Sequence, residues 1–200
     1  MKHKWQTQYD KKSPPWDYDK FDPDFKKFFK DYSVTIKNQK IIDLGCGTGS
    51  QIHYIQKLGF TNTTGTDIVN ALEYDVKNFI IDDALDSKLD QRYDIVFDRG
   101  LLHNIYHLKN RIKYFKMLND ITHEKSYIVL KVMSPYEPRM HPSIDAGPYR
   151  FSEKQLQELF NVIGFKCVEL KDTFFHSNSI VPHLRGYFSV YKWDKDHDRD

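Results

Sequence analysis

Three alternating glycines follow an acidic residue at the end of an apolar run in residues 41–49. Ile41 and Ile42 predict the end of a buried parallel strand, and the glycines let the backbone turn sharply and approach a ligand closely because they carry no Cβ. Residues 50–58 have apolar side chains at helical spacing, so the helix N-terminus would present free backbone N–H groups. This order predicts a nucleoside-cofactor site at the first turn of a doubly wound sheet, with a tight turn that binds no ligand as the alternative.

Acidic side chains around this loop indicate which cofactor suits it. Asp43 stands two residues before Gly45, where a carboxylate would repel the pyrophosphate of a dinucleotide but suits a ligand with an ammonium group. S-adenosylmethionine has such a group. Asp67 ends the second expected strand, where a carboxylate can accept hydrogen bonds from both ribose hydroxyls. Asp83 follows the third, where an adenine amino group would be recognised. The set favours S-adenosylmethionine over NAD.

These residues resemble the motifs of the class I S-adenosylmethionine-dependent methyltransferases. The segment 43–49 is similar to their first motif, Asp67 to the acid after the second strand, 83–84 to the adenine-side motif and 93–100 to the fourth-strand motif. The resemblance covers roughly residues 36–193 and implies the reaction product S-adenosylhomocysteine. It implies a cofactor site made of Asp43, Gly45, Cys46, Gly47, Thr48, Gly49, Asp67, Ile68, Asp83, Ala84, Asp98 and Arg99.

Strands and helices alternate through the middle of the chain, which favours parallel βαβ units. We expect an α/β fold: a Rossmann-like, doubly wound, mostly parallel seven-stranded sheet with an antiparallel last strand and helices on both faces. The expected strands are 40–44, 63–67, 78–81, 93–98, 126–132, 165–171 and 186–193, and the expected helices are 21–31, 49–58, 108–120 and 152–163. A serine cap is expected at Ser152.

A single domain is expected over residues 1–200, with an N-terminal lid segment (1–31), a Rossmann-like core (36–193) and a frayed tail (194–200). Two further segments, 134–150 and about 172–185, are expected as long loops at the ligand-binding edge of the sheet. The net charge of only +2 gives no nucleic-acid signal. The chain shows no apolar signal segment and no run of roughly 20 apolar residues, so we expect a cytoplasmic protein with no membrane contact. The oligomeric state stays open.

A narrower resemblance rests on three short segments. Trp5 and the run 14–17 precede the core, 98–105 follows the fourth strand, and 148–152 opens the last helix. Together they are similar to the thiopurine methyltransferase and tellurite-resistance group. This resemblance implies that Trp16 covers the bound cofactor. It also implies a small-molecule acceptor, such as a thiol, a related selenium or tellurium nucleophile, or a small aromatic metabolite.

Methyl transfer from a sulfonium needs a base only when the nucleophile starts protonated. A thiol is already partly ionised at neutral pH, whereas an alcohol is not. His103 is the candidate base, with a purely structural role at the turn after strand four as the alternative. Arg99 either contacts the cofactor, orients Asp98 or forms a structural salt bridge. Tyr136, Arg139 and Arg150 are the candidate substrate-binding residues.

No metal site is expected, because His103 and His107 stand four residues apart without an evident third ligand. Residues 98–101 also differ from the Asn/Asp-Pro-Pro-Tyr motif of enzymes that methylate amino groups of bases. A protein or RNA methyltransferase remains an alternative function. So does a non-catalytic S-adenosylmethionine-binding module that acts through a partner protein.

Overall fold

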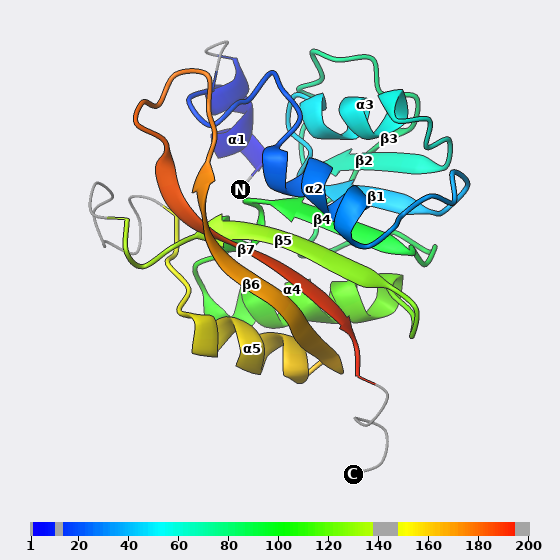
Figure 1. Ribbon diagram of the computed structural model, residues 1–200. Coiled ribbons are helices and arrows are strands. Elements are labelled where there is room, and N and C mark those ends of the chain that lie inside the picture. Colours follow the sequence, from blue (N-terminus) through cyan, green and yellow to red (C-terminus); the bar gives the residue numbers. More distant parts are fainter. Residues whose placement is uncertain (1, 11–13, 138–147, 195–200) are drawn as a thin grey trace.

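The computed structural model describes residues 2–10, 14–137 and 148–194 (Figure 1). Seven strands form one sheet in the order β3-β2-β1-β4-β5-β7-β6. The strands are β1 (Ile41–Leu44), β2 (Thr63–Asp67), β3 (Phe79–Ile81), β4 (Ile95–Arg99), β5 (Tyr127–Met133), β6 (Phe165–Phe175) and β7 (Leu184–Trp193). The first five are parallel to one another, and β7 is antiparallel to both β5 and β6. The expected mostly parallel, doubly wound sheet is therefore confirmed.

Helices cover both faces of this sheet (Figure 1). The helices are α1 (Lys2–Tyr9), α2 (Pro23–Asp31), α3 (Ser50–Lys57), α4 (Leu108–Ile121) and α5 (Glu153–Asn161), and a 3₁₀ helix, η1 (Leu102–Asn104), follows β4. Ile41 packs with α2 and α3 on one face, whereas its neighbour Ile42 packs with α4 and α5 on the other. This alternation is the period-two pattern of a strand that is buried on both faces.

The N-terminal residues divide between two positions. Three phenylalanines of α2 are buried, and each places its ring within 6 Å of the Phe97 ring on β4, with centroid distances of 4.7 Å for Phe25, 5.7 Å for Phe28 and 5.6 Å for Phe29. This helix is therefore part of a core layer, although the sequence placed it in a lid segment outside the core. Helix α1 was not expected, because its sequence has no apolar stripe, and none of its residues is buried.

The C-terminal hairpin is longer than the sequence indicated. Residues 172–185 were expected as a loop, but β6 continues to Phe175 and β7 begins at Leu184, so only 176–183 connect them. Along this extension Phe174 is half exposed and Phe175 is buried, which is the alternation of an edge strand. The expected strand ended at this point because two polar residues, Lys171 and Asp172, interrupt the apolar pattern.

Helix α5 begins where the sequence placed it. Ser152 accepts a hydrogen bond from the backbone N–H of Gln155, and the Gln155 side chain accepts one from the Ser152 N–H. This reciprocal pair is a capping box and confirms the expected serine cap. The tail from residue 195 onward, most of the expected frayed segment 194–200, lies outside the described residues.

Candidate functional site

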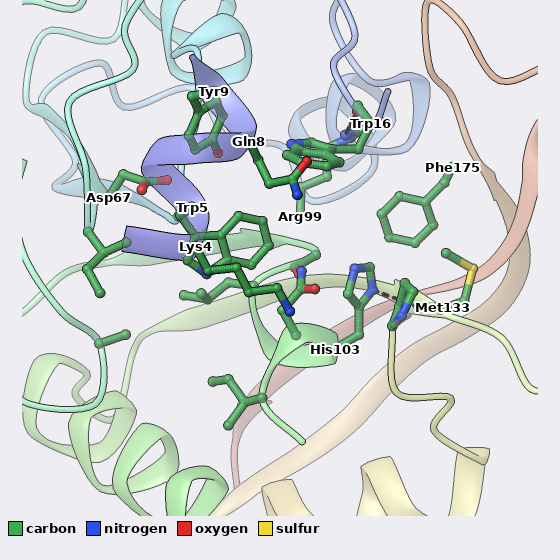
Figure 2. Close-up of a pocket in the computed structure, with 18 of the residues that line it drawn as sticks. Lys4, Trp5, Gln8, Tyr9, Trp16, Asp67, Arg99, His103, Met133 and Phe175 are labelled. Carbon is green, nitrogen blue, oxygen red and sulfur yellow. Dashed lines mark hydrogen bonds between the residues drawn. The ribbon is translucent and has the colours of Figure 1, made fainter. Parts of the chain in front are cut away.

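A cavity of about 440 Å³ opens where the carboxyl ends of the parallel strands meet (Figure 2). Gly45 follows β1, Asp67 ends β2, Gly100 follows β4 and Met133 ends β5, and all four line this main cavity. The strand order reverses between β1 and β4, and in open α/β sheets the ligand lies at such a switch point. The topology thus brings together residues that are up to 88 positions apart in sequence (from 45 to 133).

The glycine loop joins β1 to α3 beside this cavity. Gly47 has a φ of 56°, and a Cβ there would approach the Tyr9 hydroxyl to 2.9 Å, so a larger residue would be both strained and crowded. The Gly47 N–H donates to Oδ2 of Asp67 at 3.0 Å, which ties the loop to the end of β2. The Thr48 hydroxyl donates to Asp17 at 2.8 Å. The N-terminal segment therefore lies directly on the loop.

A second, smaller cavity of about 50 Å³ lies between the glycine loop and the N-terminal segment. It shares four lining residues with the main cavity, which are Tyr9, Trp16, Gly45 and Arg99. Of the predicted cofactor residues, Trp16, Gly45, Asp67, Ile68, Asp83, Ala84 and Arg99 line the main cavity, and Asp43, Cys46, Gly47 and Thr48 line the smaller one. The structure thus brings eleven of the thirteen predicted residues to two adjoining cavities.

Gly49 and Asp98, the other two predicted cofactor residues, line neither cavity. Gly49 caps α3 with a φ of 86°, and a Cβ there would meet Val76 at 2.6 Å, so packing against the following loop accounts for it. The Asp98 carboxylate is fully buried and accepts hydrogen bonds from the Leu101 and Leu102 N–H groups and from the Tyr114 hydroxyl. It therefore holds the turn after β4.

Two buried carboxylates flank the glycine loop. Burial, with a contribution from nearby Asp98, raises the pKa of Asp43 to about 8. Burial also raises the pKa of Asp67, although the Val69 and Gly47 N–H groups oppose this rise. Only Arg99 offsets the shift at Asp43, so this carboxyl favours its protonated form until a cation arrives. A positively charged ligand beside Asp43 would favour the ionised carboxylate.

Arg99 forms a structural ion pair, one of the alternatives that the sequence left open. Its Nε donates to Asp22 at 3.0 Å, and its other nitrogens donate to the carbonyls of Trp16 at 3.3 Å and of His176. One guanidinium therefore connects the end of β4 to the N-terminal segment and to the β6–β7 connection. Because Arg99 also lines both cavities, its side chain is part of the wall that these segments form.

A buried charge cluster behind Arg99 was missed by sequence reasoning. Lys131 on β5 is fully buried, and its Nζ lies 2.8 Å from Asp22 Oδ1 and 2.8 Å from Asp24 Oδ2. Burial opposes ionisation of Asp22, but Lys131 and Arg99 hold the pKa of that carboxyl below its usual value. The signal was a lone lysine inside an apolar strand, which requires a buried counter-ion.

Aromatic side chains of the N-terminal segment cover the main cavity. Trp5 and Tyr9 of α1 each pack edge to face against Trp16, with ring centroids 5.7 Å and 6.0 Å apart. Figure 2 shows Trp5 between Asp67 and His103, with Tyr9, Gln8 and Trp16 beside it. The predicted position of Trp16 over the cavity fits this arrangement, and Trp5 belongs to the same predicted segment, whereas the contributions of Lys4, Gln8 and Tyr9 were not anticipated.

His103 lies on η1 at the far end of the main cavity from Asp67 (Figure 2). Its Nδ1 accepts a hydrogen bond from the Met133 backbone N–H at 3.1 Å. Burial, assisted by the Arg99 guanidinium, lowers the pKa of His103 to about 3. The ring also packs against Phe175, with centroids 5.2 Å apart. The imidazole is therefore neutral at physiological pH.

The predicted substrate-binding residues are not brought together at the cavity. Tyr136 lies in the turn after β5, is 64% exposed and is outside the lining. Arg139 lies outside the described residues. Arg150 is not a lining residue either, and its Nε and Nη2 are buried without a hydrogen-bond partner among the residues that the structure describes. From this segment, Pro148 reaches the cavity.

Apolar side chains form the part of the main cavity near His103, and the sequence did not identify them. They come from the turn after η1 (Ile105), the end of β5 (Met133), the segment before α5 (Pro148) and the β6–β7 hairpin (Phe175, Ile180 and Leu184). Within residues 2–10, 14–137 and 148–194, no three His, Cys, Asp or Glu side chains are placed to hold a metal ion. In the same ranges, no helix has the length and apolar character needed to cross a membrane.

Comparisons with known proteins agree with this geometry. Residues 17–170 match the family model described as a methyltransferase domain. A search of curated protein sequences finds no significant match.

Solved structures share the fold at low sequence identity. A protein studied for the conversion of a disulfide bond into a thioacetal group during echinomycin biosynthesis superimposes with a TM-score of 0.75 at 20% identity, over 92% of this chain and 87% of that one. The 1,6-didemethyltoxoflavin-N1-methyltransferase of Burkholderia thailandensis was solved with bound 1,6-didemethyltoxoflavin and S-adenosylhomocysteine. It superimposes with a TM-score of 0.72 at 14% sequence identity, over 97% of this chain and 87% of that one. The magnesium protoporphyrin IX methyltransferase of Synechocystis, with bound S-adenosylmethionine, superimposes with a TM-score of 0.61 at 13% sequence identity, over 84% of this chain and 77% of that one.

Proposed function

This chain belongs to the methyltransferase-domain family, and from that premise we propose that it transfers the methyl group of S-adenosylmethionine to a small-molecule nucleophile. One observation carries the proposal. The glycine loop, Asp43 and Asp67 lie where the smaller cavity adjoins the main one, with Asp43 on the smaller and Asp67 on the main cavity, and the other end of the main cavity is apolar and contains His103. A polar, acidic end and an apolar end in two adjoining cavities fit a charged nucleoside cofactor facing a small acceptor.

The residues present fit this cofactor. Gly47 lines the smaller cavity, and a Cβ there would meet the Tyr9 hydroxyl, so the lack of a side chain keeps the backbone of the loop accessible to a close ligand. Asp43, whose carboxyl is buried and lacks a full counter-charge, suits the ammonium group, and Asp67 suits the ribose hydroxyls. When bound, the cofactor supplies an electrophilic methyl group on a sulfonium. The protein then has to align the acceptor and exclude water.

The covering segment supports exclusion of water. Trp5, Tyr9 and Trp16 pack on one another above the main cavity, and Arg99 holds the Trp16 carbonyl in place. Asp83 and Ala84 line the cavity next to Asp67, which is consistent with recognition of the adenine there. We propose that α1 and residues 14–22, the described parts of the N-terminal segment, cover the bound cofactor.

A sulfur nucleophile is the favoured acceptor. The acceptor side offers apolar and aromatic walls, among them Met133, Phe175 and Ile105, which suit a soft, poorly hydrated nucleophile. The echinomycin neighbour acts in the conversion of a disulfide into a thioacetal, which is sulfur chemistry, and the narrower resemblance to the thiopurine methyltransferase group points the same way. The toxoflavin and protoporphyrin neighbours are named for small planar acceptors, which supports a small molecule over a protein or RNA.

Calorimetric titration tests the cofactor assignment first. We expect S-adenosylmethionine and S-adenosylhomocysteine to bind and NAD to give no heat. Asp67→Ala should weaken cofactor binding at least tenfold, about 1.4 kcal/mol, because it removes the acceptor of the ribose hydroxyls. Asp86→Ala, at an exposed carboxylate outside both cavities, is the matched control and should bind normally.

A panel of thiols, amines, phenols and carboxylates, assayed for S-adenosylhomocysteine release, then tests the acceptor class. Turnover with small thiols supports the proposal. Tight cofactor binding without turnover of any panel member would instead favour the non-catalytic binding module. Binding of NAD alone would refute the cofactor assignment.

A further inference from the structure

The two ring nitrogens of His103 have different environments. Nδ1 faces the end of β5 and accepts the hydrogen bond from the Met133 N–H. Nε2 lies on the opposite side of the ring, close to Gly100, where a Cβ would come within 3.0 Å of it. Figure 2 shows the ring standing in the cavity between Phe175 and the covering side chains of α1. The residue was expected to act as a base, so the nitrogen that carries the proton decides what it can do.

Hydrogen-bond accounting fixes the tautomer. A backbone N–H can only donate, so Nδ1 must present its lone pair to Met133. A neutral imidazole has one N–H, and it must then be on Nε2. The opposite tautomer would place two N–H groups against each other and leave a buried backbone donor without a partner. Nε2 therefore has no lone pair to receive a proton.

The surroundings also disfavour a second proton on the ring. The charged side chains that line the cavity near His103 are cations, Arg99 from β4 and Lys4 from α1, and both would repel an imidazolium. The carboxylates of the main cavity, Asp67, Asp82 and Asp83, lie at the cofactor end. On the remaining sides the ring is packed against apolar groups such as Phe175 and Met133. These surroundings therefore favour the neutral form of His103.

We propose that His103 is a hydrogen-bond donor to the methyl acceptor through Nε2–H, and that the site selects acceptors that arrive unprotonated, such as thiolates. This inference rests on the proposed function. The acceptor loses its proton to solvent before it enters. The bond between sulfonium sulfur and methyl breaks, the bond between acceptor sulfur and methyl forms, and no proton moves to His103. The Nε2–H group orients the thiolate through one of its remaining lone pairs.

Nuclear magnetic resonance of ¹⁵N-histidine-labelled protein tests the tautomer without relying on activity. Long-range ¹H–¹⁵N spectra distinguish the Nε2–H form, the Nδ1–H form and the imidazolium, and His103→Asn identifies the His103 signals by their loss. We expect the Nε2–H form, unchanged from about pH 5.5 to pH 8.5. An Nδ1–H tautomer, or titration of His103 within that range, would overturn the proposal.

Two substitutions separate the donor from the structural hydrogen bond. In His103→Asn, the side-chain oxygen can still accept from the Met133 N–H, but no group replaces Nε2–H. In His103→Gln, the amide N–H₂ reaches the position of Nε2. With thiophenol as the acceptor, we expect KM to rise about tenfold in His103→Asn with little change in kcat, and to recover in His103→Gln. Equal KM values in wild type and His103→Asn would overturn the proposal.

The pH profile gives a second readout. With two thiophenols of different acidity, the midpoint of kcat/KM against pH should follow the pKa of each thiol. A midpoint that stays the same for both would identify a base on the protein instead. Calorimetry with S-adenosylhomocysteine runs alongside, and both variants should bind it normally. If wild type does not bind S-adenosylhomocysteine, the proposed function is refuted. If it binds but His103 carries its proton on Nδ1, only this inference is refuted.

Discussion

Replacing Asp43 by asparagine should abolish a proton release that accompanies cofactor binding in the wild-type protein. Burial raises the pKa of Asp43 to about 8, so the free protein holds this carboxyl largely protonated at pH 7. An ammonium group placed in the smaller cavity favours the carboxylate and expels the proton. Asp43→Asn keeps the size and the polarity of the side chain but has no proton to release.

The expected magnitude follows from the pKa values. At pH 7, a pKa of about 8 means that about 0.9 of the Asp43 carboxyls are protonated in the free protein. A neighbouring positive charge lowers a carboxyl pKa by about 1–3 units, so a bound-state value near 6 leaves about 0.1 protonated. Binding should thus release about 0.8 proton per site. Between pH 6 and pH 8, the linkage makes the affinity of wild type increase about fivefold for each pH unit, and below pH 6 the increase flattens.

Calorimetry of S-adenosylhomocysteine binding in buffers with different ionisation enthalpies measures this number directly. The amine of the ligand itself titrates near pH 8 and takes up a small fraction of a proton, but this contribution is the same for both proteins. The difference between wild type and Asp43→Asn is therefore the informative quantity. A difference below about 0.2 proton at pH 7 would refute the assignment of Asp43 to the ammonium group.

Three stability predictions use urea unfolding of the ligand-free protein. The pKa of Asp43 is about 8 in the folded protein and near 4 in the unfolded chain, so between these pH values the folded state holds a proton that the unfolded chain has lost. The free energy of unfolding of wild type therefore decreases as the pH rises through this range. Asp43→Asn lacks this titration, so its unfolding free energy should rise by about 2 kcal/mol relative to that of wild type from pH 6 to pH 8. A difference between the two proteins that does not change with pH would contradict this. Lys131→Met should cost about 3–5 kcal/mol, since it leaves two buried carboxylates without their lysine, and a loss under about 1 kcal/mol would show that the cluster is dispensable. Phe97→Ala should cost about 3–5 kcal/mol through the cavity left beside α2, against under about 1 kcal/mol for the half-exposed control Phe174→Ala.

The parts of the site that the sequence predicted are local in the chain. Asp43 and Asp67 lie in the last two residues of β1 and β2, and the glycine loop and Asp83 follow β1 and β3, so their places at the sheet edge follow from strand order alone. Asp98 belongs to the same kind of position, yet its carboxylate turns back to cap its own loop. Residue type and spacing place a side chain at an edge but do not determine which way it points.

The parts that the sequence missed depend on distant pairings. Arg99 and Asp22 are 77 residues apart, and Lys131 and Asp22 are 109 apart, so no spacing rule connects them. Helix α1 has no apolar stripe, because its aromatic side chains pack on Trp16 and not on the core. The walls near His103 come from the β6–β7 hairpin, whose extension is visible only once its pairing is known.

Asp22 connects the two ends of the cavity. Its backbone N–H donates to Gln51 on α3, the helix that the glycine loop opens, and its carboxylate pairs with Arg99 and Lys131 near the carboxyl ends of β4 and β5. Those strands lead directly into the turn that carries His103 and into Met133, which fixes the His103 tautomer. Asp22 also begins α2, to which the covering segment is attached. One buried charge cluster thus contacts the covering segment, the helix behind the glycine loop and the strands that lead to the apolar wall near His103, so under the proposed function the core holds both ends of the cavity.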